Sequence, residues 1–120
     1  MTFTTGEHPR GTVPAVPGTR EISRTKYEIA RFRVSVVRGA DMPVSIESSG
    51  VELTVGTAEG NHLRLTDPAV SRHHCVLAVT PTGVEVRDLD STNGTTLAGY
   101  RVNSAYVAQG ALVGVGETTL

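Results

Sequence analysis

The sequence consists largely of short runs in which apolar and polar residues alternate, separated by clusters of glycine, proline, serine and asparagine. In residues 31–36, for example, Phe32, Val34 and Val36 alternate with polar side chains, which is the pattern of a strand with one buried face. Comparable runs recur to the end of the sequence, and no long stretch has a helical period. This pattern predicts an all-β sandwich of about ten or eleven short strands connected by tight turns.

The length of 120 residues is sufficient for one domain with a modest core, but not for two. With three Tyr, two Phe and no Trp, the core must be filled mainly by Val, Leu and Ile. The single cysteine, Cys75, excludes an intramolecular disulfide and fits a reducing compartment. No segment is apolar enough to span a bilayer and the first residues lack a secretory signal, so we expect a cytoplasmic protein without membrane contact.

The first thirty residues differ in character from the rest. They contain three prolines, many Thr, Ser and Gly residues, and no periodic pattern, so we predict a flexible basic tail at residues 1–30. We expect the folded domain at residues 31–120, with its last strand interrupted at Leu120. Residues 1–40 carry a net charge of +4 and residues 41–120 a net charge of −5. A nucleic-acid-binding domain would have a basic folded part, so we expect no direct binding of nucleic acid.

Two predicted loops contain most of the chemically useful side chains. The first, residues 67–74, has the sequence Asp-Pro-Ala-Val-Ser-Arg-His-His, and the second, residues 88–95, has the sequence Asp-Leu-Asp-Ser-Thr-Asn-Gly-Thr. Hydroxyl, amide and guanidinium groups together suit a phosphate better than a metal or an acyl group. Within the second loop, Asn93-Gly94 predicts a tight two-residue hairpin turn, because both residues tolerate positive φ.

Four parts of the sequence together resemble a known family. They are Val55-Gly56 before a loop, Ser-Arg-His-His at residues 71–74, Ser-Thr-Asn-Gly-Thr at residues 91–95, and residues 112–116. The combination resembles the forkhead-associated (FHA) domain over residues 31–120. This resemblance implies a β-sandwich that binds phosphothreonine peptides at one end, without catalysis or a cofactor. Residues 55–61 and 71–75 look most like the amino-terminal FHA domains of bacterial sigma-54-dependent transcriptional activators.

The resemblance also implies roles for individual residues. The phosphate would be held by Ser71, Arg72 and Thr92, and the peptide backbone by Asn93. Gly56, His74 and Gly94 would be structural, with His74 propping the two loops against each other. Many members of the family have Arg after the glycine that corresponds to Gly56, whereas this chain has Thr57, so the strongest charge-assisted contact is missing. Thr57 and Arg64 are therefore possible auxiliary residues, and Arg64 or Arg72 could compensate for the missing charge.

Two other kinds of site are less consistent with the sequence. A hydrolase would need Ser71 as the nucleophile, with His74 and Asp88 or Asp90 as partners, but the strand, turn and helix of a nucleophile elbow are lacking. A metal site would need His73, His74 and Cys75 to converge, whereas adjacent residues of an extended chain point to opposite sides. We therefore expect neither an enzyme nor a metal-binding protein.

The function expected from the sequence is phosphothreonine recognition by the sensory module of a larger signalling protein. That protein would be a sigma-54-dependent regulator whose ATPase and DNA-binding parts lie beyond Leu120. Its phosphothreonine-containing partner could be intramolecular, for example residues 4–7 of the tail. The alternative is a phosphate-independent interaction or oligomerisation domain that keeps the fold and has lost the ligand.

Overall fold

The computed structural model describes residues 2–4 and 31–120, and these residues form strands and turns without a helix. The predicted all-β sandwich is confirmed, and the described residues form twelve strands where ten or eleven were expected. The strands are β1 (Thr2–Thr4), β2 (Arg31–Ser35), β3 (Ser45–Glu47), β4 (Glu52–Gly56), β5 (Leu63–Arg64), β6 (Cys75–Thr80), β7 (Gly83–Asp88), β8 (Thr95–Leu97), β9 (Tyr100–Val102), β10 (Ser104–Val107), β11 (Val113–Val115) and β12 (Thr118–Thr119).

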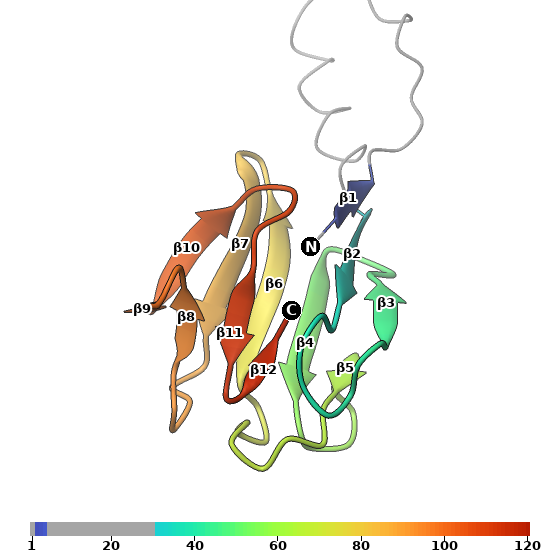
Figure 1. Cartoon of the computed structure of the whole chain (residues 1–120). Coiled ribbons are helices and arrows are strands. Elements are labelled where there is room, and N and C mark those ends of the chain that lie inside the picture. The colour runs from blue at the N-terminus through green and yellow to red at the C-terminus, as the bar shows by residue number, and fades with distance from the viewer. Residues whose placement is uncertain (1, 5–30) are drawn as a thin grey trace, which may run out of the picture.

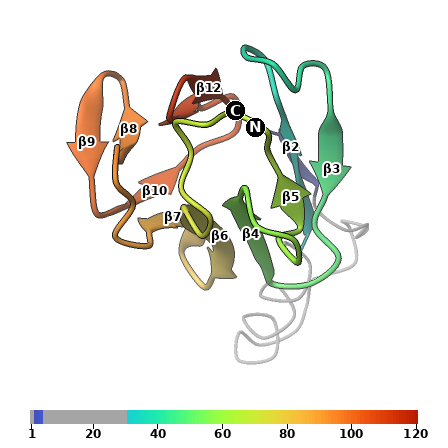
Figure 2. The ribbon, with the colours of Figure 1, turned by 90° about the horizontal axis from the view of Figure 1, so that it is seen from below.

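The strands form two layers (Figure 1). One layer is a five-stranded sheet in the order β10-β7-β6-β4-β5. The other combines the sheet β1-β2-β3 with the sheet β12-β11-β8-β9, which are joined where Arg38 pairs with Thr119. Viewed from below, the layers lie on opposite sides of the core, and the loop that leaves β4 and the loops that enter β6 and β8 lie at this end of the molecule (Figure 2).

Alternation along the strands produces the core between the layers. Phe32 and Val34 of β2 are fully buried, whereas the arginines on either side of Phe32 are exposed. Because successive side chains of a strand point to opposite faces, β2, β4, β7 and β11 each contribute two apolar side chains to the core. The last residue, Leu120, is also fully buried and exchanges two backbone hydrogen bonds with Val113. In the described residues no helix could span a membrane.

The prediction of a hairpin turn at Asn93-Gly94 is wrong. The strands on either side, β7 and β8, belong to different layers, so residues 89–94 form a crossing between sheets. Gly94 does have a positive φ of 87°, but Asn93 does not. A two-residue turn with both φ angles positive occurs instead at Ala98 (52°) and Gly99 (84°), between β8 and β9. The Asn-Gly dipeptide therefore predicted the positive φ of Gly94 correctly, but it did not predict which strands pair on either side of it.

One strand lies inside the segment predicted to be a flexible tail. Residues Thr2–Thr4 pair antiparallel with β2, opposite Arg31 to Arg33. The remainder of that segment, residues 1 and 5–30, lies outside the described residues. The flexible tail and the domain boundary near Arg31 therefore stay predictions.

The turn between β8 and β9 generates a stability prediction. Ala98 occupies the left-handed region, which costs an L-residue with a Cβ about 1–2 kcal/mol and which Asn tolerates better. We expect Ala98→Asn to raise the free energy of unfolding by about 1 kcal/mol, measured by urea denaturation. The matched control is Ala108→Asn, at an exposed position without positive φ. Equal effects at both positions would contradict the assignment of this turn.

Candidate functional site

The two loops singled out in the sequence are hydrogen-bonded to each other at one rim of the sandwich. The Thr92 amide donates to Ser71 Oγ at 3.0 Å, and Asn93 Nδ2 donates to the Ala69 carbonyl at 2.8 Å. Ser71 is half-buried, whereas Thr92 and Asn93 are exposed. Because Ser71 Oγ accepts from the protein, its O–H is left to donate to a ligand. Asn93 likewise keeps its side-chain oxygen as an acceptor facing solvent.

His74 connects the same two loops from inside the protein. Its side chain is fully buried, and its Nδ1 accepts a hydrogen bond of 3.0 Å from the Ser71 amide. The proton must therefore be on Nε2, which donates to the Gly94 carbonyl at 2.9 Å. The neighbouring His73 is exposed, as expected for adjacent residues in an extended segment. One imidazole ring thus fixes the spacing between the two loops.

Asp88 holds the second loop in shape. Its carboxylate accepts hydrogen bonds from the Ser91 amide and hydroxyl and from the Thr95 hydroxyl, while Ser91 Oγ accepts from the Gly94 amide at 2.9 Å. Burial raises the pKa of Asp88, but the hydrogen bonds from Ser91 and Thr95 lower it by a larger amount. The net pKa of Asp88 therefore lies below its usual range. The carboxylate is therefore an ionised anchor for the loop.

Asp67 has the equivalent function in the first loop. Its carboxylate accepts from the Ala69 amide within the loop, and from the Glu117 amide and the Thr118 hydroxyl, each at 2.8 Å. Burial raises the pKa of Asp67, but hydrogen bonds from Ala69, Thr118 and Glu117 bring the net pKa below its usual value. The first loop is thereby tied to the turn between β11 and β12.

A third loop, residues 57–62 between β4 and β5, is held beside Ser71 and Arg72 by contacts of Gly56 and Thr57. A Cβ at Gly56 would lie 2.0 Å from the Arg72 carbonyl oxygen, so only glycine allows this approach. The Thr57 amide donates to the Ser71 carbonyl at 3.1 Å, which places Thr57 next to the predicted phosphate ligand. Asn61, which the sequence interpretation did not single out, donates from Nδ2 to the Arg72 carbonyl at 2.9 Å.

Three arginines lie on or beside these loops. Arg64 donates from Nε to the Thr57 carbonyl at 2.9 Å, and its side chain is exposed. Arg72 is exposed, with no side-chain partner among the described residues. Arg101 of β9 was not predicted: its guanidinium donates to the Ser91 carbonyl at 3.4 Å and fills the space that a Gly94 Cβ would occupy. The Ala98-Gly99 turn, which folds β9 back along β8, was the sequence signal that could have brought Arg101 to this loop.

The geometry disfavours a hydrolytic site. Both ring nitrogens of His74 are bonded to backbone groups, and Ser71 Oγ bonds to the Thr92 amide and not to the imidazole. Burial, followed by the nearby Asp88 charge, raises the pKa of the Cys75 thiol to about 12, so the thiol stays protonated and unreactive. In the described residues no group of three His, Cys, Asp or Glu side chains could hold a metal ion.

Comparison with known proteins identifies the family of the chain that carries these loops. Residues 53–116, which include all three loops, match the FHA domain family. The chain is also 35% identical over 107 residues to the FHA domain-containing protein FhaB of Mycobacterium tuberculosis, covering 88% of this chain and 68% of FhaB. The chain therefore belongs to the FHA domain family.

Two further comparisons show the range of proteins that contain this domain. The ABC transporter ATP-binding/permease protein Rv1747 of Mycobacterium tuberculosis is 39% identical over 66 residues, which is 55% of this chain but 8% of the transporter. The fold is also that of an FHA domain solved in a study of phosphothreonine-dependent FHA domain interactions, with a TM-score of 0.66 and 24% identity over 72% of this chain and 88% of that one. The domain thus occurs in proteins of very different size.

The position of His74 leads to a mutational prediction. His74→Ala would leave the Ser71 amide and the Gly94 carbonyl unpaired next to a cavity, so we expect a loss of about 1–3 kcal/mol in the free energy of unfolding. The adjacent exposed residue provides a matched control, His73→Ala, for which we expect a change within about 0.5 kcal/mol. Chemical denaturation measures both. Equal stability of His74→Ala and the wild type would show that the imidazole does not hold the loops.

The carboxylate anchors lead to a prediction about pH. The pKa of Asp67 is lower in the folded than in the unfolded protein, so its contribution to stability is complete above the unfolded pKa of about 4 and is lost as the pH falls through the folded pKa. We expect Asp67→Asn to be less stable at neutral pH by about 1–3 kcal/mol and to lose less stability on acidification than the wild type. Glu59→Gln, at an exposed position without positive φ, is the control. If the free energy of unfolding depends on pH in the same way in the wild type and in Asp67→Asn, the proposed role of this carboxylate is wrong.

Proposed function

We propose that this FHA domain recognises a protein segment that carries phosphothreonine and does so without catalysis. The observation that carries the proposal is the hydrogen bond between the Thr92 amide and Ser71 Oγ, which holds the Ser71 hydroxyl of one loop against the Thr92 backbone of the other at the exposed rim. Ser71, Thr92 and the exposed Arg72 would bind the phosphate oxygens, and Asn93 would bind the peptide backbone. The similarity to a domain studied for phosphothreonine-dependent interactions supports this proposal.

Arg64 offers a replacement for the arginine that the family often has in the place of Thr57. The hydrogen bond from its Nε to the Thr57 carbonyl places its guanidinium beside the residue whose amide bonds to Ser71. The other N–H groups of Arg64 can then donate to a phosphate. A phosphate adds about −1.5 to −2 charges at neutral pH, so Arg64 and Arg72 together favour the phosphorylated segment over the plain one.

The protein that contains this domain would use it to detect a kinase product. The relatives reported above, FhaB and an ABC transporter, do not support the sigma-54-dependent regulator expected from the sequence, so the ATPase and DNA-binding partners and the cytoplasmic location stay predictions. A phosphate-independent interaction domain remains the second candidate, because Thr57 removes the family's strongest charged contact.

The test is a calorimetric titration with a phosphothreonine peptide selected from a degenerate library and with the same peptide carrying plain threonine. We expect binding of the phosphorylated form only, and a loss of about ten- to a hundredfold in affinity for Ser71→Ala, since a hydrogen bond to a charged group is worth about 1.5–3 kcal/mol. Ser104→Ala, at an exposed position on β10, is the control. Equal binding of both peptides, or of neither, would favour the second candidate.

A further inference from the structure

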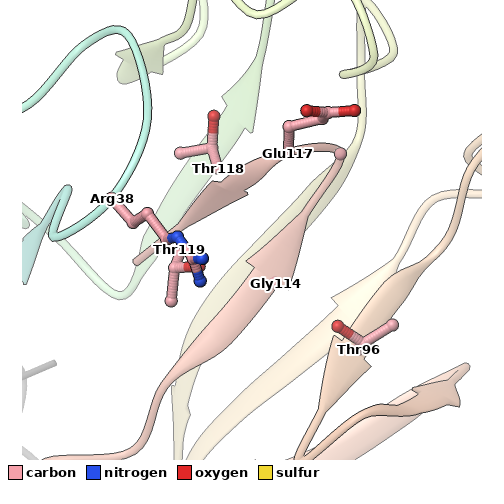
Figure 3. A pocket seen from close by; sticks show the side chains of 7 residues that line it. Arg38, Thr96, Gly114, Glu117, Thr118 and Thr119 are labelled. Atoms are coloured by element: carbon pink, nitrogen blue, oxygen red, sulfur yellow. The ribbon is translucent and has the colours of Figure 1, made fainter.

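A groove lies on the outer face of the sheet formed by β12, β11 and β8 (Figure 3). Its volume is about 400 Å³, and its lining includes Arg38, Thr96, Gly114, Gly116, Glu117 and Thr119. None of these residues belongs to the phosphate-binding set proposed above. The lining is polar, with one cation at one end and one anion at the other.

The strand register explains why these side chains converge. Thr96 pairs with Gly114, Gly114 pairs with Thr119, and Thr119 pairs with Arg38 across the sheet. Directly opposite residues of antiparallel strands have side chains on the same face. Gly114 has no side chain, and the Thr96 hydroxyl takes the space beside it, 2.3 Å from where a Cβ would lie. The groove therefore presents the hydroxyls of Thr96 and Thr119 along this row.

The position of Arg38 is due to a local irregularity in the pairing. The amides of Val37 and Arg38 both donate to the Thr119 carbonyl, at 2.9 and 3.3 Å, so two residues of one segment oppose one residue of β12. Such a bulge redirects the side chain that follows it. Figure 3 shows Arg38 lying beside Thr119, and among the described residues its exposed guanidinium has no ion-pair partner.

The groove begins where the loop rim ends. Asn93 donates to the Ala69 carbonyl, and Gly116 lies against the same carbonyl group, since a Cβ on Gly116 would be 2.9 Å from its carbon. Glu117 follows, with its amide bonded to Asp67. A peptide held by Asn93 can therefore continue over Ala69 and Gly116 into the groove.

We propose that the groove binds the continuation of the phosphothreonine segment, and that Arg38 pairs with an acidic side chain on it. This inference rests on the proposed function. The planar guanidinium pairs well with a carboxylate, and the hydroxyls of Thr96 and Thr119 can donate to the same group. Glu117, near the rim, repels acidic residues close to the phosphothreonine. A peptide that passes Ala69, Gly116 and Glu117 before it reaches Arg38 needs several extended residues of about 3.3 Å each, so acidic residues about three to six positions from the phosphothreonine are the ones to test.

The test compares phosphothreonine peptides that have Glu or Lys at these positions, placed on either side of the phosphothreonine. We expect the wild type to bind one of the Glu peptides about two- to fivefold more tightly than its Lys counterpart, the range for an exposed ion pair. Arg38→Gln should abolish this preference and Arg38→Glu should reverse it. Arg87→Glu, which makes the same change of charge as Arg38→Glu but in the other layer, should leave the preference as in the wild type.

Each contrary outcome is distinguishable. If phosphorylated peptides bind and the preference is the same in the wild type and both Arg38 variants, the inference is wrong and the proposed function stands. If no peptide binds in a phosphate-dependent manner, both fail. Arg38-dependent binding of an unphosphorylated acidic peptide would show that the groove is a separate site. A change in oligomeric state caused by Arg38→Glu, seen by size-exclusion chromatography, would show that a second copy of the chain occupies the groove.

Discussion

The rim depends on one buried imidazole. His74 accepts a hydrogen bond from the Ser71 amide and donates one to the carbonyl of Gly94, 20 residues further along the sequence, so a single fully buried ring holds the two loops together. A buried polar ring is stable only when both of its nitrogens are paired, because an unpaired one costs about 1–3 kcal/mol. The same requirement fixes the positions of Ser71 and Thr92, whose hydroxyl and amide bond to each other. The exposed groups proposed to bind the ligand are thus held in place by a side chain that is buried beneath them.

Two ionised carboxylates complete this arrangement. Asp88 shapes the loop that carries Thr92 and Asn93, and Asp67 ties the other loop to the turn between β11 and β12. Each accepts several hydrogen bonds from amides and hydroxyls, which stabilise the charged form against the effect of burial. Because the loops are ordered before a ligand binds, binding requires little further ordering of the backbone. The connection through Asp67 also explains why the groove on the outer sheet is continuous with the rim.

Much of the fold was predictable from local patterns, because alternation specifies which face of a strand is buried. The alternation in residues 31–36, for example, is observed as β2, in which Phe32 and Val34 are fully buried. Contacts between distant segments were not predictable, since nothing near Asp67 in the sequence indicates that it accepts from Thr118, 51 residues away. The hairpin expected at Asn93-Gly94 failed for the same reason: the turn signal is local, whereas the assignment of β7 and β8 to different layers is not. Arg101 was missed because its contact with Gly94 depends on the return of β9 along β8. The binding roles of Ser71, Arg72, Thr92 and Asn93 stay predictions.

The central claim is that the exposed rim between the loops of Ser71 and Thr92 binds phosphothreonine. It is tested most directly by following the backbone amides of the ¹⁵N-labelled protein by NMR during titration with a phosphothreonine peptide. We predict that the largest shift changes occur at the amides of Ser71, Arg72, Thr92 and Asn93, and that the plain threonine peptide causes none of them. Changes confined to the outer face of the five-stranded sheet, or identical changes with both peptides, would contradict the account.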